Sequence, residues 1–221
     1  MGVAAVRVVV DDVLPRRGLL QRDLVASVGK LYEFNIKPTI PEGVPAGAIP
    51  ILTFQSGQFL ADDGKIPIIQ LGIFPDGEGV TAQDTNLADI VLTDFLTHLN
   101  EVFGYRFTDE NSPRSFFSGV VVEFASEFVE QVGALHTIQA VVNAALDQPV
   151  HHYQLKRLAL GPDSSNDAGS PTSVEQLTPR EFLIERRVVS GMERNRFFCG
   201  APLAIDKHLE MLDRVERAVI G

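Results

Sequence analysis

The chain has 221 residues, of which 45% are hydrophobic and 22% are charged, and its formal net charge at pH 7 is −10. This length and composition are typical of one globular domain with a single buried core. No apolar run reaches the roughly 18 residues that a membrane-spanning helix needs. The one cysteine, Cys199, excludes an internal disulfide framework and favours a reducing compartment. We therefore expect a single domain over residues 1–221 of a cytoplasmic protein.

Negative charge is concentrated in the middle of the chain. Residues 40–150 contain fifteen Asp and Glu residues but only three basic ones. This excess repels phosphate backbones, so it argues against nucleic acid as a partner, and it would suit a basic protein partner. A well-solvated surface that keeps the chain soluble is the simpler explanation of the same charge.

The first half of the chain predicts mainly strands. Valine-rich residues 3–10 indicate a strand, residues 19–26 a short helix, and residues 28–36 a second strand. A loop rich in Pro and Gly follows at 38–47. Three short strands are then expected between residues 51 and 83. They are separated by the turns Asp62-Asp63-Gly64 and 75–79, where glycine is free to adopt a positive φ.

A long amphipathic helix is predicted from Leu87 to Phe103. Its apolar residues form one continuous stripe of the width that faces a core. Thr85 or Asn86 can cap its N-terminus, and Gly104 ends it.

The second half predicts further strands and helices in alternation. A strand is expected at 116–125, and a second long helix at 127–146. The inward residues of that helix would be Phe128, Val132, Leu135, Ile138, Val142 and Leu146. Strands are also expected at 150–160, 181–189 and 196–199, with a flexible loop at 161–178 and a closing helix whose apolar spacing runs from Ile205 to Val219.

These elements predict an α+β fold. We expect a mainly antiparallel sheet with the two long helices on one face and the C-terminal helix packed at an edge. The order of strands and helices between residues 80 and 160 leaves some parallel pairing open. No sequence repeat occurs at a fixed period.

Sequence motifs for nucleotide binding and for nucleophilic catalysis are absent. The chain has no phosphate-binding loop of the required spacing, no dinucleotide-binding glycine motif and no nucleophile elbow. One thiol cannot build a cysteine zinc site. Cys199 follows two phenylalanines and is expected to be a buried structural thiol, and His208 is expected among ordinary polar neighbours. We therefore predict no cofactor and no bound metal.

The best candidates for acid–base or metal chemistry are Asp94, His98 and Glu101. Their spacings of four and three residues place them on one side of the predicted helix at 87–103. Two carboxylates and an imidazole so placed can converge on one divalent ion. The alternative is the ordinary polar face of an amphipathic helix, in water.

Arginines are concentrated near the C-terminus. The candidate ligand-binding residues are Arg186, Arg187, Arg194 and Arg196. On the strand predicted at 181–189, Arg186 shares a face with apolar residues, so it must reach solvent, pair with an acid or bind a ligand. Bidentate recognition of a carboxylate or phosphate would suit it, and cross-strand ion pairing with the acidic segment is the alternative.

Three functions remain open from the sequence. The first is a non-enzymatic protein-interaction subunit: an adaptor, an assembly component, or an inhibitor of a basic partner. Such a subunit binds a protein partner or itself, and neither nucleic acid nor membrane. The second is a divalent-metal-dependent hydrolase that uses Asp94, His98 and Glu101. The third is binding of a small anionic ligand at the arginine segment.

Overall fold

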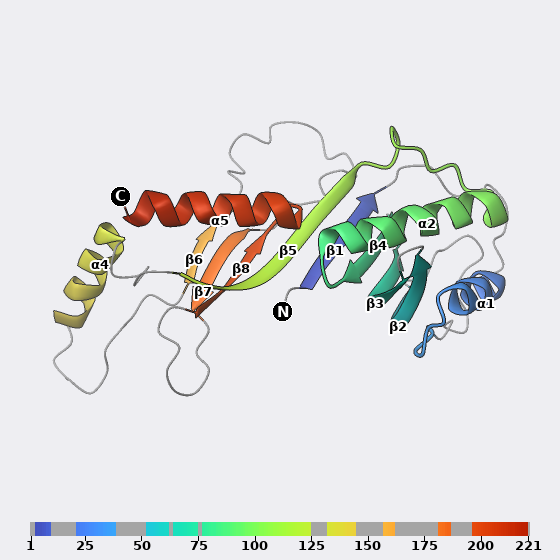
Figure 1. Ribbon diagram of the computed structural model, residues 1–221, viewed down its shortest axis with the longest axis horizontal. Helices are drawn as coiled ribbons and strands as arrows, with labels where there is room; N and C mark the ends of the chain where they lie inside the picture. Colours follow the sequence, from blue (N-terminus) through green and yellow to red (C-terminus); the bar gives the residue numbers. More distant parts are fainter. Residues whose placement is uncertain are drawn as a thin grey trace.

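The computed structural model describes residues 3–9, 21–38, 52–61, 64–74, 77–124, 132–144, 157–161, 181–186 and 196–220. In this part of the chain, one eight-stranded sheet carries two long helices on one face (Figure 1). The strands are β1 (Val3–Val9), β2 (Leu52–Ala61), β3 (Gly64–Phe74), β4 (Gly77–Ala82), β5 (Arg114–Glu123), β6 (Arg157–Leu160), β7 (Phe182–Arg186) and β8 (Arg196–Ala201). The helices are α1 (Gln21–Leu31), α2 (Thr85–Phe103), α4 (Gly133–Ala144) and α5 (Ile205–Ile220).

The strands follow the order β2-β3-β4-β1-β5-β8-β7-β6, and every described pairing is antiparallel. The predicted α+β class and the antiparallel sheet are therefore confirmed. The turn glycines behave as predicted, because Gly64 and Gly77 have φ angles of 132° and 146°. These are conformations that only glycine adopts without strain. Among the described helices, none is both long and apolar enough to cross a membrane.

The two halves of the chain repeat one arrangement of elements. Among the described elements, each half runs strand, helix, three strands, helix, and the strand order reads equivalently from either end of the sheet. The first strands of the halves, β1 and β5, pair at the centre, where Ala4 lies opposite Ser118. Ala4 also pairs with Ala82 of β4, and Ser118 pairs with Ala201 of β8. An approximate two-fold axis between β1 and β5 therefore relates the halves, although the sequence shows no repeat.

The helices α2 and α5 meet at this axis. Their N-termini adjoin, and the helices run away from each other over the same sheet face (Figure 1). The backbone N–H of Ile205 donates to Oγ1 of Thr85 over 2.8 Å, and Nδ2 of Asn86 donates to Oδ2 of Asp206 over 3.3 Å. Oγ1 of Thr85 thus satisfies an exposed N–H group at the N-terminus of α5, and the second bond joins side chains of the two helix ends.

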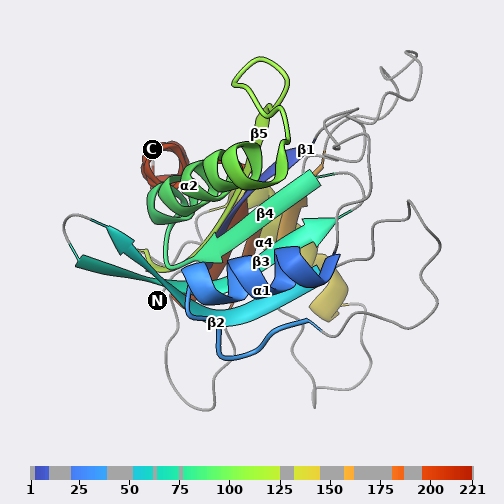
Figure 2. The ribbon, with the colours of Figure 1, turned by 90° about the vertical axis from the view of Figure 1, so that its right-hand side faces the viewer.

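The larger core belongs to the N-terminal half. It joins α2 and α1 to strands β1 to β4, through buried residues such as Val6, Val28, Leu71 and Phe95. A view from the β2 end shows α1 lying in front of β2 and β3, with α2 above the sheet (Figure 2). A smaller cluster joins α5 to the other half of the sheet, and its buried members are Phe124, Ile184, Phe197, Cys199 and Leu212.

The prediction of a strand at 28–36 was wrong. The helix α1 continues to Leu31, because Leu24 and Val28 keep helical spacing and both are buried with Tyr32. Only the end of the predicted strand is extended. There Ile36 forms a bridge with Gln55, and the N–H of Gln58 donates to the carbonyl of Tyr32 over 2.8 Å.

The helix layer also differs from the prediction. The expected second long helix at 127–146 is described only as α4, and its Val142 is 39% exposed although it was predicted to face inward. Phe128 and Leu146 lie outside the described residues, as does the loop predicted at 161–178 beyond Gly161. The C-terminal helix α5 is not at an edge of the sheet, since its Leu212 packs with Cys199 and Ile184 of the inner strands β8 and β7.

Candidate functional site

Asp94 and His98 of α2 contact α1. The hydroxyl of Tyr32 donates to Oδ2 of Asp94 over 2.7 Å, and Oγ of Ser27 lies 2.9 Å from Nε2 of His98. Tyr32 is fully buried, and burial together with the hydrogen bond to Asp94 raises the pKa of its hydroxyl. The two candidate residues therefore link two helices, a role that their spacing alone did not reveal.

Glu101, the third candidate on this helix, is exposed. Among the residues that the structure describes, no group of three or more His, Cys, Asp or Glu side chains is placed to bind a metal ion. The geometry that a metal-dependent hydrolase needs is thus not found in this part of the chain.

The arginine segment is described only in part. Arg186 ends β7 and Arg196 begins β8, whereas Arg187 and Arg194 lie outside the described residues. Arg186 is half-buried and pairs in register with Phe197, and Arg196 lies opposite Glu123 of β5. The strand register thus places Glu123 beside Arg196, which is the arrangement that cross-strand ion pairing requires.

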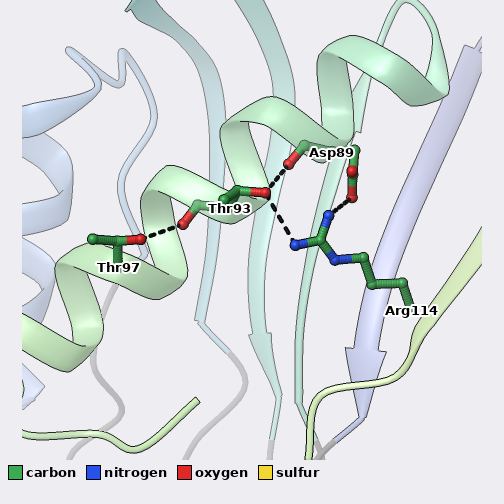
Figure 3. Close-up of polar contacts among 4 residues, drawn as sticks. All are labelled: Asp89, Thr93, Thr97 and Arg114. Carbon is green, nitrogen blue, oxygen red and sulfur yellow. Dashed lines mark hydrogen bonds and ion pairs between the residues drawn. The ribbon is translucent and has the colours of Figure 1, made fainter. Parts of the chain in front are cut away.

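A polar cavity lies where α2 meets the start of β5, and the sequence analysis did not anticipate it. Arg114 pairs with Asp89 and donates from Nη2 to Oγ1 of Thr93 over 3.1 Å (Figure 3). Oγ1 of Thr93 donates in turn to the carbonyl of Asp89, and Oγ1 of Thr97 donates to the carbonyl of Thr93.

The cavity beside these residues has a volume of about 100 Å³. Its lining residues are Thr93, Leu96, Thr97, Asn100, Phe107, Thr108, Asp109, Ser112 and Arg114. This is well below the roughly 300 to 1,000 Å³ of typical small-molecule sites. Threonines spaced four apart on α2 were the only sequence signal, and such spacing is common on exposed helix faces.

A carboxylate and an imidazole are among the buried side chains of the sheet region. Glu78 of β4 is 3% exposed, and burial together with the charge of Glu78 raises the pKa of Tyr105 to about 12. His208 of α5 is fully buried, and its Nδ1 lies 2.7 Å from Oγ of Ser118. His208 has a polar neighbour in Ser118, but the sequence analysis did not anticipate that α5 would bury its ring against the central strand.

The two ends of the sheet are covered differently. At the β2 end, residues 32–36 hydrogen-bond to the outer edge of β2. At the β6 end, no described segment pairs with the outer edge, and Leu160 is 59% exposed there. A strand edge that no other segment pairs with can accept an additional strand.

Comparison with protein-family models, with curated proteins and with solved structures finds no match to this chain.

Proposed function

We propose that this chain is a non-enzymatic protein-interaction subunit that binds an extended segment of a partner protein along the outer edge of β6. The observation that carries the proposal is the difference between the two sheet ends. The fold already accepts an extended segment at the β2 edge, through the pairing of Ile36 with Gln55. The two-fold-related edge at β6 has no such cover among the described residues.

Strand addition fits the groups that this edge presents. Backbone N–H and C=O groups of an edge strand give affinity, and neighbouring side chains give selectivity. Leu160 is exposed beside the edge, and Leu158 is half-buried. The net charge of −10 favours a basic segment, because it steers cationic partners toward the chain.

The hydrolase and anion-binding alternatives have weaker support. Tyr32 and Ser27 engage Asp94 and His98, so a metal ion would have to displace contacts that hold α1. At the arginine segment, Arg196 lies opposite Glu123 of β5, so an acidic side chain is already beside one of the candidate arginines.

The test starts from a displayed library of random peptides selected on the immobilised protein. Recovered peptides are synthesised and titrated by fluorescence anisotropy, and the bound complex is followed by amide hydrogen exchange. We expect peptides of positive net charge that slow exchange at residues 157–160.

Strand addition has a signature that other binding modes lack. In an antiparallel pair, alternate residues direct both backbone groups toward the neighbouring strand. N-methylation of one alternate set of peptide amides should therefore weaken binding at least about tenfold, and methylation of the other set should not. An equal loss of affinity for the two methylated sets would refute the proposal. Slower amide exchange at α2 with no change at β6 would also refute it. A dimer with protected β6 that binds no peptide would instead identify a second copy as the occupant, which contradicts a heterologous partner.

A further inference from the structure

The two helices over the sheet are anchored unequally. Counted over described side chains, α2 buries seven residues, whereas α5 buries only His208 and Leu212. One of these two anchors is ionisable. Val215 and Val219 of α5 also pack against the cluster under this helix but are only half-buried, so His208 is one of the two buried contacts of α5.

The internal two-fold relationship shows what is unusual about this anchor. The fourth residue of α2 is Ala88, and the fourth residue of α5 is His208. The strand residues related by the same axis are Ala4 and Ser118. All four are buried, so the N-terminal half has an alanine pair where the C-terminal half has a serine and a histidine.

Only one of the two ring nitrogens of His208 has a hydrogen-bond partner among the described residues. Its Nδ1 contacts Ser118, and the ring lies edge-on to Phe182 at 6.4 Å between centroids. Its Nε2 is buried and has no hydrogen-bond partner among the described residues. A protonated ring carries an N–H on both nitrogens, so protonation would add a buried charge and a donor that no described acceptor meets.

We propose that α5 is an acid-releasable cover of the C-terminal half of the sheet, and that protonation of His208 frees it while α2 stays in place. Release would expose the apolar face formed by Ile184, Cys199 and Phe197. This regulation is independent of the binding proposed at β6.

The charged groups near His208 do not compensate for a proton on the ring. From β5 the ring meets Ser118, and from β7 it meets Phe182, neither of which ionises near neutral pH. On β8, Cys199 belongs to the cluster under α5, and burial raises the pKa of its thiol to about 12, so it stays neutral. On the adjoining helix ends, Asp206 is exposed and bonded to Asn86 of α2.

The remaining charges of α5 near this turn are directed to solvent. Lys207 is exposed, and exposed Glu210 pairs with Arg214 over 2.5 Å. No described carboxylate contacts the imidazole.

The direction of the pH effect follows from burial. Burial lowers the pKa of His208 below its ordinary 6.5. In the released helix, the pKa of His208 has its ordinary value, so the ring takes up a proton more readily than it does in the packed helix. The state in which α5 packs on the sheet is therefore most stable above about pH 6.5. Its stability falls as the pH decreases from 6.5 toward the pKa of His208 in the packed helix.

The experiment follows amide hydrogen exchange of the full chain at pH 7.5 and pH 5.5, corrected for intrinsic exchange rates. We expect the opening equilibrium of α5 to rise at pH 5.5 by up to about tenfold, because pH 5.5 lies one unit below the ordinary pKa of histidine. The internal reference is α2, whose protection should not change.

The matched variant is Ser118→Ala with His208→Leu, which replaces both polar partners by apolar groups, as in the N-terminal half. Its α5 should be equally protected at both pH values. The control His98→Gln should keep the acid response of α5. Equal α5 protection at both pH values in the wild type, or an unchanged acid response in the double variant, would overturn the proposal. The wild-type comparison decides the question even if the double variant does not fold.

Discussion

The hydroxyl of Tyr32 and the carboxylate of Asp94 form a hydrogen bond of 2.7 Å that joins the end of α1 to the middle of α2. Tyr32 is fully buried, whereas Asp94 is half-buried at the border of the same interface. The phenol ring also packs edge-on against Phe95, with 6.3 Å between ring centroids. One residue thus provides both apolar contact and a charge-assisted hydrogen bond between the helices.

Replacement of Tyr32 by phenylalanine tests this contact. Tyr32→Phe keeps the ring and removes the donor, so we expect a loss of about 1 to 3 kcal/mol of unfolding free energy, as for hydrogen bonds to charged groups. Urea denaturation measures it. The matched control is Tyr105→Phe, since Tyr105 is also buried but stacks on Phe107 and has no part in the contact of Tyr32 with Asp94. Equal losses in the two variants would contradict the role given to the Tyr32 hydroxyl.

Gly57 allows the close approach of the segment that covers β2. A Cβ at this position would lie 2.4 Å from the ring of Phe34 and 2.9 Å from the carbonyl oxygen of Tyr32. Because backbone is one of the two obstacles, Gly57→Ala should destabilise the protein by about 1 to 3 kcal/mol. Gly133→Ala is the control, since nothing lies within 4 Å of the added methyl at the start of α4, and it should be neutral or slightly stabilising. Thermal denaturation of both variants makes the comparison.

The sequence predicted the elements that depend on local patterns. The apolar pattern of α2 predicted correctly that the helix ends at Phe103. Gly104 follows in the left-handed conformation, with a φ of 70°. The cap was assigned to the wrong residue, because Asp84 accepts from the N–H of Leu87. Thr85 and Asn86 instead contact α5, a long-range pairing that local spacing cannot reveal.

The candidate site was less predictable than the fold. The spacing of Asp94 and His98 correctly placed them on one side of α2, but their partners Ser27 and Tyr32 are remote in sequence. The two-fold relationship was also hidden, since the repeat lies in the order of elements while its paired positions hold different residues. His208 is one example, because its equivalent is Ala88.

The pair of Arg114 and Asp89 should contribute modestly to stability. Their side chains are 26% and 33% exposed, so solvent weakens the attraction. A double-mutant cycle with alanine at both positions should give a coupling energy of about 0.2 to 1 kcal/mol that falls as salt is added. The reference is the helical pair of Arg217 and Asp213, at 76% and 53% exposure, which should couple less. A larger coupling at the more exposed pair would show that burial does not set the strength here.

Cys199 should be inert toward thiol reagents in the folded protein. The side chain is fully buried, and burial raises the pKa of its thiol from 9.0 to about 12. Because the thiolate is the reactive form, native labelling at pH 8 should be at least about a thousandfold slower than labelling in urea. The unfolded thiol ionises near pH 9 and the folded one does not, so stability should also fall as pH rises from about 9 toward 12. Labelling with a chromogenic disulfide, with Cys199→Ala as the blank, measures the rate. Rapid labelling of the native protein would mean that α5 already leaves the sheet at this pH. The packing of α5 would then not depend on the charge of His208.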